Sequence, residues 1–186
     1  MSRRLRYVLP AIVVAASAAW LVGCDAQGWC QQNVLPTAST LSAIHGVDRE
    51  HVWAVGSDGV VVAFDGAAWS AVPSGVDVRF ADVWASGPDD VWALDRYGSC
   101  SVLRFDGSQW RADDLGLVDR DARDLWGADR DHVWMAGESE VPLLHHDGAR
   151  VSRLEPPGAP SLTGIAGDGA GRLWAVGDGG EILARE

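Results

Sequence analysis

The chain contains 186 residues with a formal net charge of −11, and 47% of its residues are hydrophobic. This apolar content excludes a disordered polyelectrolyte, while 22 Gly and 8 Pro disfavour a bundle of helices. The length suits one domain of ordinary size. The net acidity argues against a nucleic-acid partner, because a protein needs cationic side chains to bind phosphates.

The first two dozen residues have the pattern of an export signal. Arg3, Arg4 and Arg6 precede an apolar run that covers residues 7–22, as in the charged and apolar regions of a secretory signal peptide. A membrane span would want about 20 apolar residues, and this run has only about 16. The N-terminus is therefore expected to be a signal peptide.

The apolar run ends in Leu21-Val22-Gly23-Cys24, which resembles the lipobox of bacterial lipoproteins. The resemblance implies a signal peptide over residues 1–23, a lipid on the Cys24 thiol and a tether over residues 24–28. It also implies that the membrane is a partner through this anchor, with the protein in the bacterial cell envelope, on its periplasmic or surface face. The alternative is a simple signal peptide with an incidental cysteine.

The rest of the chain, residues 29–186, is a repeat. One marker is a tryptophan that recurs at spacings of 39, 42 and 40 residues, at Trp53, Trp92, Trp134 and Trp174. A second marker is an earlier bulky apolar position that recurs at spacings of 40, 42 and 39 residues, at Ile44, Trp84, Trp126 and Ile165. Two markers in phase indicate four copies of one structural unit.

Each unit contains about four short β-type runs separated by turns rich in Asp and Gly. In the first unit the expected strands cover residues 41–47, 51–56, 60–64 and 69–72. Four antiparallel strands in about 40 residues are typical of one β-propeller blade, and a sandwich of short strands would not explain so regular a period. The fold class is therefore expected to be all-β, a four-bladed β-propeller.

The units resemble the propeller-type VWAVG…FDG…W repeats of secreted and lipoprotein chains, and distantly the Asp-box of sialidase propellers. The Asp-box places five residues from Asp to Trp, whereas Asp65 to Trp69 is four. The resemblance implies an architecture and no particular activity.

The fourth unit stops after its third strand, and the segment 29–36 has the phase of the missing strand. Trp29 and Ile44 are 15 residues apart, as are Trp69 and Trp84. We therefore expect this N-terminal strand to close the last blade of a four-bladed ring. The alternative is an eight-bladed ring built from two chains.

The candidate contact surface consists of residues that do not repeat between blades, because a residue present in every blade is more simply explained by packing. These residues are Arg96, Tyr97, Glu138, Glu140 and His145.

No catalytic residues, metal or cofactor are expected, because nucleophile, metal-ligand and phosphate-loop motifs are missing from the sequence. An ion near Asp82 and Asp124, beside the inner-strand tryptophans, is a further possibility. Cys30 and Cys100 should fall in blades that face each other across the ring, so no disulfide bond is expected.

These observations predict a non-enzymatic envelope lipoprotein whose propeller is a platform for another envelope protein. The alternative is a carbohydrate-binding or glycan-cleaving module.

Overall fold

The computed structural model describes residues 21–32, 37–97, 102–113, 122–137, 143–158 and 161–185. The chain divides into two compact units, one that ends at Asn33 and one that begins at Val34. All the regular secondary structure in the described ranges is β-strand, and none of it is a helix long and apolar enough to cross a membrane.

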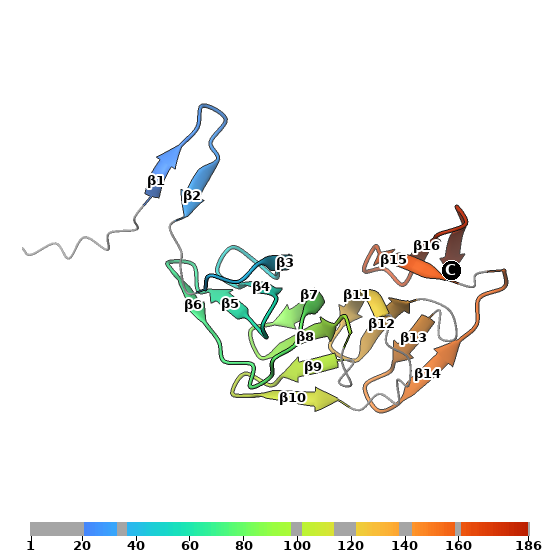
Figure 1. Cartoon of the computed structure of the whole chain (residues 1–186). Helices are drawn as coiled ribbons and strands as arrows, with labels where there is room; N and C mark the ends of the chain where they lie inside the picture. Colours follow the sequence, from blue (N-terminus) through green and yellow to red (C-terminus); the bar gives the residue numbers. More distant parts are fainter. Residues whose placement is uncertain are drawn as a thin grey trace, which may run out of the picture. The chain divides into compact units, whose positions relative to one another are not determined.

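The described residues of the larger unit form four antiparallel sheets that follow one another along the chain (Figure 1). The first contains β3 (Leu41–Gly46), β4 (Val52–Gly56), β5 (Val61–Phe64) and β6 (Trp69–Ala71). The second contains β7 (Phe80–Gly87), β8 (Asp90–Asp95), β9 (Val102–Phe105) and β10 (Trp110–Asp113). The third contains β11 (Ala122–Asp129), β12 (His132–Gly137), β13 (Leu143–His146) and β14 (Val151–Leu154). The last contains β15 (Leu162–Gly167), β16 (Leu173–Gly177) and β17 (Ile182–Arg185).

The turn between the third and fourth strands of a sheet is built by one aspartate. In the first sheet, the Asp65 Oδ1 atom accepts hydrogen bonds from the backbone N–H groups of Ala67 and Ala68, at 2.9 and 2.8 Å. Gly66 provides the positive φ of 89° that this turn needs. Asp106 and Asp147 build the same turn in the next two sheets.

Adjacent sheets are joined at their innermost strands, because β3 packs on β7, β7 on β11, and β11 on β15. A polar side chain strengthens each junction. The Ser42 hydroxyl donates to the backbone carbonyl of Phe80 at 2.6 Å. The Asp82 carboxyl accepts from the Leu125 N–H at 2.9 Å, and the Asp124 carboxyl accepts from the Ile165 N–H at 2.7 Å.

The hydrophobic core lies between the sheets and not within one of them. Among the described residues, three clusters of buried side chains occur, one at each junction between consecutive sheets. Trp53 of the first sheet packs against the second, Trp92 of the second against the third, and Trp134 of the third against the last. The recurring tryptophan is therefore a packing element between sheets, as its repetition predicts.

The predicted all-β repeat is confirmed, with four strands in each of the first three units. The predicted closure of the ring is not confirmed. The strand β2 (Cys30–Gln32) pairs with β1 (Leu21–Cys24), and β17 has no outer partner among the described strands. No packing like that between the other inner strands joins β15 to β3 in the part of the chain that the structure describes.

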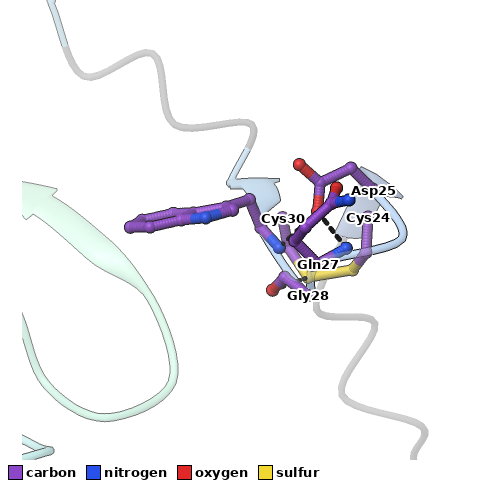
Figure 2. Close-up of a disulfide and its surroundings, with 6 residues drawn as sticks. Cys24, Asp25, Gln27, Gly28 and Cys30 are labelled. Carbon is purple, nitrogen blue, oxygen red and sulfur yellow. Dashed lines mark hydrogen bonds between the residues drawn. A yellow bond between two sulfur atoms is a disulfide. The ribbon is translucent and has the colours of Figure 1, made fainter.

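The prediction that the chain has no disulfide bond is wrong, because Cys24 is bonded to Cys30 (Figure 2). The β1–β2 hairpin brings the two Cα atoms to 4.0 Å, and the Asp25 carboxyl holds its turn by accepting from the N–H groups of Gln27 and Trp29. Because the sequence assigned Cys24 to a lipid, only Cys30 and Cys100 were considered as a possible disulfide pair. Cys100 lies outside the described residues.

Candidate functional site

The last sheet exposes a face that the other three sheets bury. In each of the four sheets, the second and third strands pair two residues at the same position of the repeat. These pairs are Val55–Val61, Leu94–Val102, Ala136–Leu143 and Val176–Ile182. In the first three sheets this pair and the recurring tryptophan lie in the core against the next sheet.

We call the corresponding residues of the last sheet, Trp174, Val176 and Ile182, the end face. Their exposed fractions are 38%, 43% and 76%, whereas every counterpart in the other three sheets is at most 9% exposed. A patch of side chains suited to the core but left in contact with water is typical of an interaction surface.

Charged groups border the end face. The guanidinium of Arg172 lies 5.6 Å from the centre of the Trp174 ring, and its Nε bonds the Asp168 carboxyl at 2.7 Å. The backbone N–H of Ala170, together with Arg172, lowers the pKa of Asp168. Asp168 therefore stays charged at neutral pH and fixes the cation over the aromatic ring.

A cavity of about 350 Å³ lies between the third and last sheets, near the free edge of β17. Its walls are mainly aliphatic and include Leu143, Leu154, Leu173 and Leu183. Arg185 and Glu155 are also part of its lining.

The equivalent space between the first two sheets is filled by aromatic rings. Phe105 at the end of β9 and Trp110 at the start of β10 pack on each other, with ring centres 5.2 Å apart. Both also pack on Trp53 of the first sheet, at 5.3 and 6.2 Å. In the last sheet Arg185 occupies the position of Phe105, and no described strand supplies the counterpart of Trp110.

The innermost strands bring two carboxyl groups together. Burial raises the pKa of Asp82 to about 7, and a hydrogen bond with the neighbouring carboxyl of Asp124 contributes in the same direction. Two carboxyls in contact favour a shared proton, because a second negative charge would be repelled. No group of three or more His, Cys, Asp and Glu side chains in the described ranges is placed to hold a metal.

Of the residues predicted as a contact surface, the structure describes Arg96, Tyr97 and His145, which lie in or beside two different sheets. Tyr97 is exposed beyond the end of β8, and Arg96 lies against its ring at 5.5 Å. His145 instead belongs to β13, where its ring stacks on Trp134 at 4.4 Å between ring centres. Burial lowers the pKa of His145, and the charge of Arg185 adds to the effect. Glu138 and Glu140 lie outside the described residues.

Sequence reasoning missed the end face because its residues occupy ordinary repeat positions. It dismissed Trp174 as a packing residue together with its three counterparts. The segment Leu173–Gly177 repeats the pattern of Val52–Gly56, so the sequence carries no signal that separates Trp174 from Trp53.

No protein-family model matches the chain, and no curated protein matches it in sequence. Solved structures do match. YCF48 from Cyanidioschyzon merolae is 20% identical with a TM-score of 0.59, over 82% of this chain and 55% of that one. A structure of YCF48 bound to D1 peptide is 19% identical with a TM-score of 0.53, over 81% of this chain and 66% of that one.

A virginiamycin B lyase from Staphylococcus aureus is 14% identical with a TM-score of 0.65, over 87% of this chain and 61% of that one. The chain thus spans between 55% and 66% of the length of these structures. At such low identity the likeness shows the fold alone, which is that of a β-propeller-like protein.

The prediction that the chain is not an enzyme is contradicted by this likeness, because the neighbours include a lyase. The absence of familiar catalytic motifs does not exclude an enzyme, because another protein of similar fold is a lyase. At 14% identity the likeness does not assign the same activity to this chain.

Proposed function

We propose that this protein is a propeller-type platform for binding another protein at the bacterial cell envelope, and that the end face is its contact surface. The observation that carries the proposal is the exposure of Trp174, Val176 and Ile182, whose counterparts are buried wherever another sheet follows. Protein interfaces are rich in exposed aromatic and aliphatic side chains of this kind. The peptide bound by the similar YCF48 supports the proposal, because it is a protein ligand on a related architecture.

The proposal includes the lipid anchor on Cys24 and a four-bladed unit whose last blade takes its outermost strand from the N-terminal segment 29–36. Lipidation and the Cys24–Cys30 bond use the same sulfur atom, so a lipidated chain would have Cys30 as a free thiol. In the described part of the chain no sheet packs on the end face, and this leaves it open to a partner.

Two serine variants distinguish the end face from the surface predicted by the sequence. Ile182→Ser removes the most exposed apolar side chain of the end face, and Tyr97→Ser removes the exposed aromatic side chain beyond β8. Each variant is expressed in its native host, cross-linked in the envelope and purified, and the proteins recovered with it are quantified by mass spectrometry. Both variants should keep the wild-type melting temperature within a few degrees, since both side chains are exposed.

We expect Ile182→Ser to lower recovery of one specific envelope protein about tenfold and Tyr97→Ser to leave it unchanged. The reverse result would contradict the end face as the contact surface, as would equal recovery with both variants. Binding of the purified protein to glycans, without recovery of a protein partner, would favour the carbohydrate-binding alternative.

A further inference from the structure

The N-terminal hairpin holds two sulfur atoms together. Strands β1 and β2 pair Cys24 directly opposite Cys30 (Figure 2). Asp25 fixes the turn between the strands, because its Oδ1 atom accepts hydrogen bonds from the N–H groups two and four residues later, at 3.0 and 2.8 Å. Gly28 has a positive φ of 87° and donates its N–H to the Asp25 carbonyl at 3.1 Å. A turn held in this way keeps the two thiols close, so forming the disulfide bond costs little loop-closure entropy.

The disulfide bond can be reached from solvent and opened without disturbing the larger unit. Cys24 is exposed and Cys30 is half-buried. An external dithiol can therefore attack one of the two sulfur atoms. Opening the hairpin breaks the pairing of β1 with β2 alone, because neither strand pairs with any other strand in the described ranges.

The closed hairpin, which we define as β1 and β2 joined by the Cys24–Cys30 bond, withholds the proposed site of lipid attachment. The attacking species in such a modification is a thiolate, and a disulfide-bonded Cys24 has none. The peptide bond that precedes Cys24 lies within β1, where Leu21 and Val22 are already paired with residues of β2. An enzyme that binds an extended segment by strand addition needs an unpaired strand edge. Both the sulfur and the segment before it are thus occupied.

We propose that the hairpin is a redox switch for the lipid anchor, and that the chain is anchored only after the Cys24–Cys30 bond has been reduced. This inference rests on the proposed lipid on Cys24. A dithiol reductant of the envelope supplies two electrons and two protons: the S–S bond breaks, both cysteines become thiols and the reductant becomes a disulfide. The Cys24 thiolate then attacks a carbon atom of the lipid donor. A carbon–sulfur bond forms, the leaving group takes the electron pair of its bond, and the thiol proton passes to water.

The redox conditions of the envelope decide which state accumulates. Exported proteins meet oxidising conditions, in which two neighbouring thiols form a disulfide bond. In unperturbed cells the dithiol reductant opens the hairpin, and the anchored chain accumulates. The closed hairpin accumulates when an oxidant exceeds the supply of reductant.

Lipid attachment to the full chain in its native host tests the switch. The wild type is compared with Cys30→Ser, which cannot close the hairpin, and with Cys100→Ser, which removes the cysteine outside the pair. Each protein is synthesised in untreated cells, in cells treated with the thiol oxidant diamide, and in diamide-treated cells that then receive dithiothreitol. Intact-mass analysis of the extracted protein gives the lipidated fraction and the fraction of uncleaved chain that lacks two hydrogens.

We expect diamide to lower the lipidated fraction of the wild type and of Cys100→Ser about tenfold, and dithiothreitol to restore it. Cys30→Ser should be lipidated to the same extent in all three conditions, which also shows that diamide has not disabled the processing enzymes of the host. Asp25→Ala removes the acceptor of the turn and should be lipidated more than the wild type under diamide. Asp25→Asn keeps an oxygen acceptor and should behave as the wild type.

The outcomes separate the switch from the anchor on which it rests. An equal effect of diamide on the wild type and Cys30→Ser, whether none or a loss, would overturn the switch and leave the anchor in place. No lipid on any of the proteins in any condition would contradict the anchor itself, and the switch with it. Binding at the end face does not enter this readout.

Discussion

Asp82 gives the molecule a stability that depends on pH. Its pKa is raised to about 7 by burial and by the Asp124 carboxyl, so the folded state holds a proton that the unfolded chain releases near pH 4. The free energy of unfolding therefore falls as pH rises from about 4 to about 7 and levels off above that range. Asp82→Asn keeps an oxygen for the Leu125 N–H and removes the titration.

We expect the wild type to lose about 2 kcal/mol more than Asp82→Asn between pH 5 and pH 8, measured by urea unfolding. Burial lowers the pKa values of His45 and His145, which makes the free energy of unfolding rise with pH, the opposite direction. Both histidines are present in both proteins, so their contribution cancels in the difference. Parallel pH profiles for the two proteins would show that Asp82 is charged throughout the range.

The sulfur of Cys24 distinguishes an anchored protein from a disulfide-bonded one. In the structure it is bonded to Cys30, and the lipoprotein proposal requires it to carry a lipid. Intact-mass analysis of protein extracted from native membranes should show a chain that begins at Cys24, carries acyl groups and has a free thiol at Cys30. A chain that retains residues before Cys24 and lacks two hydrogens at the cysteine pair would contradict the anchor.

At the scale of elements, the junctions between sheets depend on small residues as well as on tryptophans. A Cβ atom at Gly127 in β11 would collide with the indole ring of Trp84 in β7. Gly127→Ala should therefore destabilise the protein by about 1–3 kcal/mol, measured by thermal or urea unfolding. The control is Gly46→Ala, where the added methyl meets a Val52 methyl group at 3.6 Å, an ordinary contact. Equal effects of the two substitutions would show that the junction can adjust to the extra atom.

The sequence was sufficient to predict most of these elements, because each unit repeats its strands and its Asp-based turns at one period. Trp53 and its counterparts mark the second strand of every sheet, and the Asp65 turn marks the hairpin that follows. The partner of β2 could not be predicted in the same way. Leu21-Val22 and Ile182-Leu183 are both apolar pairs that suit one register, so the pattern does not decide between them.

The end face was not predicted from the sequence, because its exposure depends on how the sheets are arranged in the whole molecule. Repetition identifies residues that pack between sheets, but it does not show which copy is left exposed in the described part of the chain. Trp174 therefore looked like Trp53 in the sequence, although its surroundings differ. The sequence also did not show that the register of β12 and β13 places His145 opposite Trp134, where the two rings stack.

At the scale of the whole molecule, successive sheets each cover the one before, and the last sheet leaves its end face open. Leu41 and Ile44 of the first sheet are exposed as well, although their counterparts Phe80 and Val83 in the second sheet are buried. The acidic net charge disfavours an anionic partner, so the proposed protein partner would offer apolar and neutral or basic groups.

Site-specific photo-cross-linking at position 182 tests the role of the end face most directly. A benzophenone amino acid is placed at Ile182 in cells, and the same residue at Ala67 is the control for an exposed turn away from the end face. We predict one cross-linked envelope protein from position 182, lost when Trp174→Ser is added and not formed from position 67. No product from position 182, or the same products from both positions, would contradict the end face as the contact surface.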